Sequence, residues 1–184
     1  MTVHELLDAA LAVKPIAASL SEADKNKGLQ SMAESLIAHT EEILQANKED
    51  LIAYGDGVMA DRLRLDETRI KAMAKGITDV CDLPDPVGHV LERRTLYNGL
   101  ELEKVSVPIG VVAVIYESRP NVTSDAAALL IKSGNVCILR GGKEAFRSSM
   151  AIVNALKEGL TKAGLPADLV GMPSNTDRSE ATAL

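Results

Sequence analysis

Two apolar runs of strand length, each ending in a polar loop that leads into a helix, constrain the fold of this chain more than any other feature. The first run, 111–115, is followed by the loop 117–123, and the second, 136–139, is followed by the loop 140–144. Apolar runs of this length between helical segments are typical of buried strands in a parallel sheet. Ligands bind such sheets where the strands deliver their carboxyl ends. We therefore expect both loops to open at the same edge of one sheet and to hold the functional site.

The same alternation of strand and helix continues beyond the second loop. A helix is predicted over 123–133, closed by Gly134, and a longer helix over 145–163, with Gly164 at its carboxyl end. Residues 168–172 indicate a third strand. This order predicts a βαβαβ unit with right-handed crossovers.

The region 4–80 has the apolar spacing of amphipathic helices, with steps of three and four residues. We interpret these helices as scaffold. Residues that cap helices indicate where they begin, and the candidates are Ser21 with Asp24, Asn47 with Asp50, and Asp66. The two prolines in 83–86 end the helical region.

Between the helical region and the first strand lies a predicted hairpin. Asn98-Gly99 is a strong turn signal, and 90–97 and 100–107 flank it. The apolar phase of the second strand shifts near Lys104, which predicts a bulge there. An isolated hairpin is marginally stable, so we expect it to pack on another part of the protein or on a second subunit.

Composition restricts the class of protein. With 184 residues, 46% hydrophobic and 2% aromatic, the chain can build one aliphatic domain, with or without an appendage. Its net charge of −6, without a basic face, argues against nucleic-acid binding. No apolar run reaches membrane length, and acids stand where a signal peptide has bases, so we expect a cytoplasmic protein without membrane contact.

The loop 140–144 has the composition of an anion-binding turn. Gly141 and Gly142 allow a ligand to approach the backbone, the helix N-terminus beyond offers N–H groups, and Arg140 and Lys143 add positive charge. Glu144 could accept a hydrogen bond from a ribose hydroxyl. A tight turn with surface charges explains the same residues equally well, because neither a dinucleotide-binding fingerprint nor a Walker motif is present.

The loop 118–121 is the second candidate. Its Asn121 could donate to a developing oxyanion, and Arg119 could bind a carboxylate or phosphate in fork geometry. An Asn at such a position is more often a helix N-cap or turn residue.

The sequence offers no convincing nucleophile, general base or metal site. Cys81 lies on a helical stripe and Cys137 within a strand run, so both resemble small buried hydrophobes. The three histidines are scattered without ligand-like spacing, and neither cysteine belongs to a metal-spaced pair.

Several motifs together closely resemble the γ-glutamyl phosphate reductase family, a branch of the aldehyde dehydrogenase superfamily. The strings that carry the resemblance are VPIGVV (107–112), IYESRPNVT (115–123), KSGN (132–135) and LRGGKEA (139–145). The N-terminal helices, the Asn47–Asp50 step, the hairpin and the stretch Thr176-Asp177-Arg178 are similar as well. The resemblance implies an aldehyde-dehydrogenase-like α/β fold, with helices over 1–87, a hairpin arm for homo-oligomerisation over 88–107, and the first part of a Rossmann-like NADP-binding unit over 108–184.

The resemblance also implies a reaction and roles for the candidate residues. Members of the family reduce L-glutamyl 5-phosphate with NADPH to glutamate 5-semialdehyde and phosphate through a cysteine thioester, in the second step of proline synthesis. Asn121 then resembles the oxyanion-hole asparagine of the superfamily. Arg140 falls where the superfamily has a lysine near the adenosine ribose, so the predicted cofactor cradle comprises Arg140, Gly141, Gly142, Lys143 and Glu144. The role of Arg119 in holding the substrate phosphate or carboxylate is our own hypothesis.

One departure from the family limits the expected activity. The chain stops before the segment that carries the family's catalytic cysteine, and neither Cys81 nor Cys137 matches that position. We therefore expect an N-terminal fragment that is inactive by itself. Two alternatives stay open at this point, a non-catalytic interaction or regulatory module and a stand-alone phosphate- or nucleotide-binding domain.

Overall fold

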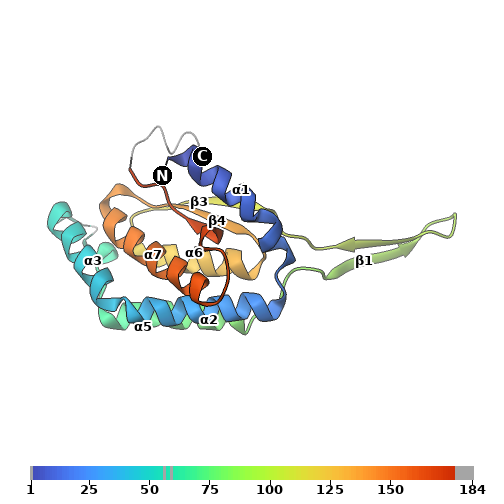
Figure 1. The fold of residues 1–184 in the computed structure, drawn as a ribbon, viewed down its shortest axis with the longest axis horizontal. Helices are drawn as coiled ribbons and strands as arrows, with labels where there is room; N and C mark the ends of the chain where they lie inside the picture. The colour runs from blue at the N-terminus through green and yellow to red at the C-terminus, as the bar shows by residue number, and fades with distance from the viewer. Residues whose placement is uncertain (1, 56, 59, 177–184) are drawn as a thin grey trace.

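A computed structural model describes residues 2–55, 57–58 and 60–176 of the chain. Its centre is a parallel sheet with the strand order β3-β4-β5, formed by Val111–Ile115, Val136–Arg140 and Val170–Gly171 (Figure 1). Parallel strands in sequence order confirm the predicted α/β unit, up to residue 176; positions 177–184 of the predicted segment, including Asp177 and Arg178, lie outside the described residues.

The central strand β4 is buried at all five positions, as the apolar run predicts. The edge strand β3 differs from the expected buried strand, because Ala113 and Ile115 are exposed. In the described residues β3 has a strand neighbour on one side only, so one side of it lacks cover. An apolar run alone does not distinguish an edge strand from a central one.

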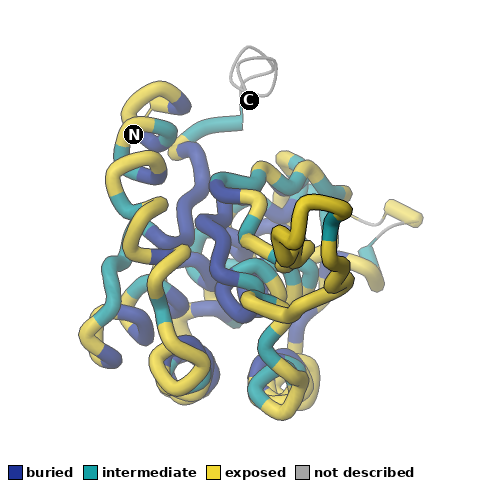
Figure 2. The backbone as a smooth tube through the Cα atoms, turned by 90° about the vertical axis from the view of Figure 1, so that its right-hand side faces the viewer, coloured by how far each residue is buried: buried dark blue, intermediate teal, exposed yellow. Residues whose placement is uncertain are grey.

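Helices cover the sheet on both faces. Helix α1 (Val3–Ser19) packs against the strands from one side, and α6 (Pro120–Lys132) and α7 (Phe146–Lys162) lie on the other (Figure 1). Helices α2 (Glu22–Ala38) and α5 (Glu67–Cys81) form an outer layer over α6 and α7. The buried residues, most of them aliphatic, lie between these layers, and Figure 2 shows the buried stretches of the backbone at the centre of the molecule.

Helices α2 and α7 approach unusually closely at Gly159. A Cβ at this position would lie 2.6 Å from both Met32 Cα and the Ser31 carbonyl oxygen. The Ser31 hydroxyl donates to the Gly159 carbonyl oxygen at 2.7 Å. The two helices therefore pack backbone against backbone at this point.

The helix starts predicted at Ser21 and Asp66 are confirmed. Ser21 and Asp24 form a reciprocal capping box at the start of α2, and Asp66 accepts from the Arg69 N–H at the start of α5. The start predicted at Asn47 and Asp50 is wrong, because both residues lie inside α3 (Thr40–Tyr54) and are buried. Their side chains bond to groups outside that helix. The short α4 (Ala60–Leu63) follows α3.

Helix α6 begins three residues earlier than the expected start at 123. Pro120 is its first residue, which suits proline because the missing N–H needs no partner there. Asn121 therefore lies in the first turn, neither in a loop nor at the N-cap, which is Arg119. The helix ends before Gly134, whose φ of 73° is the left-handed conformation expected at that position.

The predicted helix over 145–163 and the predicted strand over 168–172 are present in shortened form. A 3₁₀ turn, Lys143–Ala145, precedes α7, and Gly164 follows its C-cap with a φ of 83°. A second 3₁₀ turn, Ala167–Leu169, takes up much of the predicted strand and leaves Val170–Gly171 as β5.

The hairpin of β1 (Val90–Thr95) and β2 (Glu101–Val105) extends away from the body of the protein (Figure 1). The predicted bulge is present, with the register shifted between Val90 and Glu92 opposite Lys104, so the additional residue lies in β1. Every residue of both strands is exposed, and the expected packing on another part of the protein is absent from the described residues.

The hairpin is attached firmly at its base. Asp85, just before the first strand, forms an ion pair with the buried Lys25 of α2 at 2.8 Å. The Ser106 hydroxyl donates to the Pro86 carbonyl oxygen at 2.6 Å, and the Gly88 N–H donates to the Ser106 carbonyl oxygen at 2.9 Å.

Candidate functional site

The two predicted site loops lie at the same edge of the sheet. In the parallel register Ile115 is the partner of Arg140, and the Tyr116 N–H donates to the Arg140 carbonyl oxygen at 3.0 Å. The Ser118 hydroxyl, in the first loop, donates to the Glu144 carboxylate of the second at 2.5 Å. The geometry expected from the sequence is therefore present.

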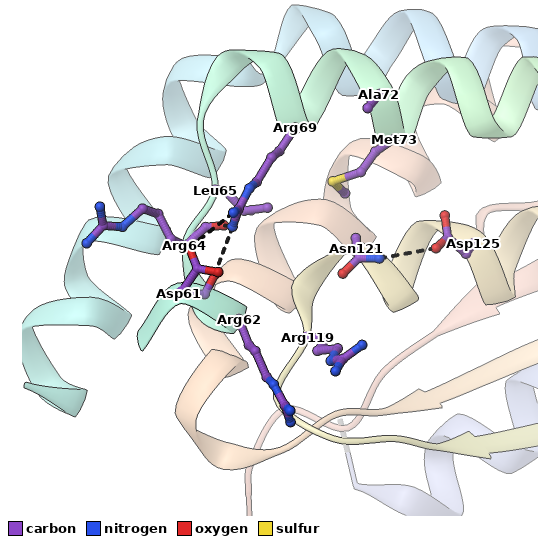
Figure 3. Close-up of a pocket in the computed structure, with 10 residues that line it drawn as sticks. All are labelled: Asp61, Arg62, Arg64, Leu65, Arg69, Ala72, Met73, Arg119, Asn121 and Asp125. Carbon is purple, nitrogen blue, oxygen red and sulfur yellow. Dashed lines mark hydrogen bonds and ion pairs between the residues drawn. The ribbon is translucent and has the colours of Figure 1, made fainter. Parts of the chain in front are cut away.

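The predicted substrate and oxyanion residues share one cavity of about 500 Å³ between α4, α5 and the start of α6 (Figure 3). Arginine is the most frequent residue in its wall. The lining residues are Asp61, Arg62, Arg64, Leu65, Arg69, Ala72, Met73, Arg119, Asn121 and Asp125.

The arginines of this cavity differ in whether their guanidinium groups already have hydrogen-bond or ion-pair partners within the protein. Arg69 is fixed, because its guanidinium donates to the Asp61 carbonyl at 2.8 Å and to the Asp61 carboxylate at 3.2 Å. Arg62 forms a loose ion pair of 3.8 Å with Glu117. Among the described residues no hydrogen bond or ion pair of the exposed Arg119 guanidinium is found. Arg119 is thus available to an anionic ligand.

The Asn121 side chain lies on the cavity wall, one turn before Asp125 (Figure 3). Its amide nitrogen donates to an Asp125 carboxylate oxygen at 3.4 Å, which is a long bond. Partial burial raises the pKa of Asp125, and the hydrogen bond from Asn121 opposes that rise. The amide is therefore oriented by Asp125 while a donor remains for a second acceptor. Its role at an oxyanion stays a prediction.

The two glycines of the second loop allow the loops to approach each other. A Cβ on Gly142 would lie 2.0 Å from the Ser118 hydroxyl oxygen, and one on Gly141 would lie 3.1 Å from the Tyr116 ring. The hydrogen bond from Ser118 lowers the pKa of Glu144, so this carboxylate is charged at neutral pH. Packing of the two loops against each other therefore explains why positions 141 and 142 are glycines, without reference to a ligand.

Arg140 does not extend into solvent. It is 7% exposed, and its guanidinium donates to the Gly141 carbonyl at 2.6 Å and to the Thr176 carbonyl at 2.8 Å. The Arg140 Nε is buried without a partner among the described residues. Arg140 therefore braces the turn against the segment after β5, and its part in the predicted cofactor cradle stays a prediction.

The N-terminus of α7 is occupied by a carboxylate of the protein, which corrects the expectation of N–H groups available to an anion. Asp50, 1% exposed, accepts from the Ser148 N–H at 2.8 Å, the Ser148 hydroxyl at 2.7 Å and the Arg147 N–H at 3.3 Å. Neighbouring Asn47 donates to the Ser148 hydroxyl at 3.0 Å and the Leu63 carbonyl at 2.7 Å. A helix N-terminus that already holds a carboxylate has no vacancy for a phosphate.

Sequence reasoning missed this buried network. The sequence predicts Asn47 and Asp50 as capping residues, but the helix that Asp50 caps begins almost one hundred positions later in the chain. The residue types indicate helix caps, but the sequence does not show which helix they cap.

Two further hollows flank the joined loops. One, of about 380 Å³, is lined by Tyr54, Leu63, Glu117, Ser118, Gly142 and Glu144. The other, of about 440 Å³, is lined by Asp50, Ala53, Tyr54, Lys143, Glu144, Arg147 and Thr176. Lys143 is exposed at the rim of the second hollow, whereas Arg147 is already paired with Glu49 and Asp50. Of the predicted cradle, Lys143 and Glu144 are thus the residues that line this second hollow.

The described residues contain neither a reactive thiol nor a metal-binding cluster. Burial raises the pKa of Cys137 to about 12 and raises that of Cys81 as well, so both thiols are protonated at neutral pH. No group of His, Cys, Asp and Glu with metal-site geometry occurs in the part of the chain that the structure describes. In that same part, no helix combines the length and apolarity needed to cross a bilayer.

Comparison with known proteins gives a consistent result. No family profile matches the chain. Among curated proteins, the γ-glutamyl phosphate reductase of Streptococcus suis is 52% identical over 187 residues, which cover 100% of this chain and 45% of that protein. This chain resembles the N-terminal part of γ-glutamyl phosphate reductase. It spans about 45% of the length of that relative.

Solved structures agree with this identification. The γ-glutamyl phosphate reductase of Thermotoga maritima superposes with a TM-score of 0.92 at 37% identity, over 97% of this chain and 44% of that one. A probable aldehyde dehydrogenase of Listeria monocytogenes shares the fold, with a TM-score of 0.74 at 18% identity over 97% of this chain and 38% of that one. The resemblance expected from the motifs is confirmed, as is the aldehyde-dehydrogenase-like α/β fold.

Proposed function

We propose that this chain provides the N-terminal part of an NADPH-dependent reductase that converts L-glutamyl 5-phosphate to L-glutamate 5-semialdehyde and phosphate, the second step of proline biosynthesis. The observation that supports this most strongly is the 52% identity to a γ-glutamyl phosphate reductase over the whole chain. A shared fold alone would not support this proposal, because one fold serves many reactions.

The cavity chemistry suits an acyl phosphate. Arg119 would hold the phosphate or a carboxylate, and Asn121 would donate to the carbonyl oxygen as negative charge develops on it. The thiolate that displaces phosphate would come from the polypeptide that follows this part in the relatives, since Cys81 and Cys137 are inert by burial. The resulting thioester would then be reduced by hydride.

The cofactor in this proposal is NADP(H), whose chemical contribution is that hydride. Lys143 and Glu144 would meet the nucleotide at the rim of the 440 Å³ hollow, with Gly141 and Gly142 shaping the turn beneath it. Arg140 would act by bracing that turn, because its guanidinium is bonded to backbone carbonyls. The cofactor phosphates would avoid the α7 N-terminus, which Asp50 already caps.

The proposal extends to organisation and place in the cell. We infer a cytoplasmic homo-oligomer whose hairpin, 88–107, is the arm that contacts another subunit, between a helical segment 1–87 and a cofactor-binding segment that begins at 108. The exposure of every residue of β1 and β2 supports a partner for this arm. A non-catalytic module that keeps the scaffold is the alternative, favoured by the inert thiols of the described residues.

A chimaeric enzyme tests the proposal. In it, this chain replaces the matching N-terminal part of the S. suis reductase, and NADP⁺-dependent oxidation of glutamate 5-semialdehyde in phosphate buffer is measured. Activity within about tenfold of the parent enzyme is expected. A chimaera that folds with the parent's melting cooperativity but does not turn over would favour the non-catalytic module.

A further inference from the structure

The polar side chains of the arginine-lined cavity lie in a fixed order. Arg119 is the N-cap of α6, Asn121 lies in the first turn, and Asp125 lies one turn further on (Figure 3). A cation, an amide donor and a carboxylate therefore follow one another along the cavity wall.

The two carboxylates of this cavity are in different states. Asp61 is paired with Arg69 at 3.2 Å. Asp125 has a long contact of 3.4 Å from the Asn121 amide and a second hydrogen-bonding contribution from the neighbouring Ser124, and no ion pair of Asp125 is found among the described residues. Asp125 is exposed, but its carboxylate packs against α5, where a Cβ on Gly76 would lie 3.8 Å from a carboxylate oxygen. This packing removes part of the hydration of the carboxylate, and the pKa of Asp125 is raised as a result. A cationic ligand group would compensate for that lost hydration.

We propose that Asp125 binds the α-ammonium group of the substrate and thereby makes this cavity selective for an amino acid over the corresponding acid without the amino group. The inference rests on the proposed function, whose substrate carries a phosphate, a reacting carbonyl and an ammonium group in that order. Arg119, Asn121 and Asp125 present a cation, an oxyanion donor and an anion in the same order. The Asn121 amide nitrogen and an Asp125 carboxylate oxygen lie 3.4 Å apart, a separation that the three carbon–carbon bonds between the reacting carbonyl carbon and the α-carbon can span.

Two ligands test the proposal, L-glutamate and glutarate. They differ only in the amino group, which carries the positive charge that Asp125 would bind. The 184-residue chain is titrated with each, and binding is followed by NMR chemical-shift changes. L-glutamate is expected to bind about tenfold more tightly than glutarate, because a charge-assisted hydrogen bond at an exposed carboxylate lies at the low end of its usual strength. Glutarate has the greater negative charge, so the arginines alone would favour it.

Asp125→Asn keeps the shape of the side chain and removes its charge. We expect this variant to lose the preference for L-glutamate, or to invert it, while its affinity for glutarate stays the same or rises. Asp61→Asn is the matched control, since Asp61 lies in the same wall but is neutralised by Arg69, and it should keep the preference. Circular dichroism melting checks that both variants are folded.

The outcomes separate this inference from the proposed function. A wild-type chain that binds both probes equally, that binds neither, or that keeps its preference in Asp125→Asn overturns the role of Asp125. Activity of the chimaeric reductase is measured independently, so an active chimaera combined with any of these results refutes the inference alone.

Discussion

The cap that Asp50 provides for α7 predicts a large loss of stability on its removal. Asp50→Ala deletes a buried carboxylate that accepts from two backbone N–H groups and the Ser148 hydroxyl. A hydrogen bond to a charged group contributes about 1.5–3 kcal/mol, and loss of an N-cap typically costs about 1 kcal/mol. These terms overlap, so we expect the free energy of unfolding to fall by about 3–4 kcal/mol, a large part of the ~5–15 kcal/mol typical of a domain.

Urea denaturation followed by circular dichroism measures this loss, and the chain provides a matched control. Glu49, the preceding residue, is exposed and forms a salt bridge with Arg147 at 3.6 Å. Because both partners are about half exposed, Glu49→Ala should change the stability by less than about 0.5 kcal/mol. Asp50→Asn, which keeps an acceptor oxygen, should fall between the two alanine variants.

The result that would refute this reasoning is an Asp50→Ala variant that loses no more stability than Glu49→Ala. In that case the N-terminus of α7 would not depend on Asp50, and the argument that it has no vacancy for a phosphate would fail as well.

Three further predictions follow from the site and the packing. In the chimaeric reductase, the proposed oxyanion role of Asn121 predicts that Asn121→Ala lowers kcat about a hundredfold or more, the usual loss when an oxyanion donor is removed, and an effect on KM alone would contradict the assignment. Gly159→Ala should destabilise the chain by about 1–3 kcal/mol in thermal melts, because its Cβ would lie 2.6 Å from Met32 Cα, and an unchanged melting temperature would contradict the close packing. For Asp85, burial acts to raise the pKa, but hydrogen bonds, chiefly from Lys25, outweigh burial and lower the pKa. The contribution of Asp85 to the stability of the fold is therefore present above about pH 4 and is lost as the pH falls through the lower, folded-state pKa. Asp85→Asn should therefore lose stability at pH 7 and show a smaller acid-induced decrease than the unmodified chain, and equal decreases would argue against this ion pair.

The parts of the fold that the sequence predicted well depend on short-range chemistry. The Ser21–Asp24 capping box, the Asn98-Gly99 turn and the left-handed glycine at 164 each involve residues a few positions apart. Such features can be predicted from the sequence because the interacting residues are close together along the chain. The shared sheet edge was also predictable, because parallel strands deliver their ends together.

The errors arise where long-range packing decides between two uses of the same residue. Asp50 has the chemistry of a helix cap, and it caps α7 instead of its own helix because packing places the two side by side. Arg140 has the charge of a phosphate ligand but turns toward two carbonyls within the protein. Similarly, the apolar β3 is half exposed because it forms the edge of the described sheet.

The hairpin has a consequence for how the molecule can vary over evolutionary time. Its strands bury nothing within the described chain, while its base is tied to the body by Lys25 and Asp85. Substitutions between 90 and 105 should therefore have little effect on the folding of the body. Changes in the hairpin and changes at the sheet edge can therefore accumulate independently in descendants of this sequence.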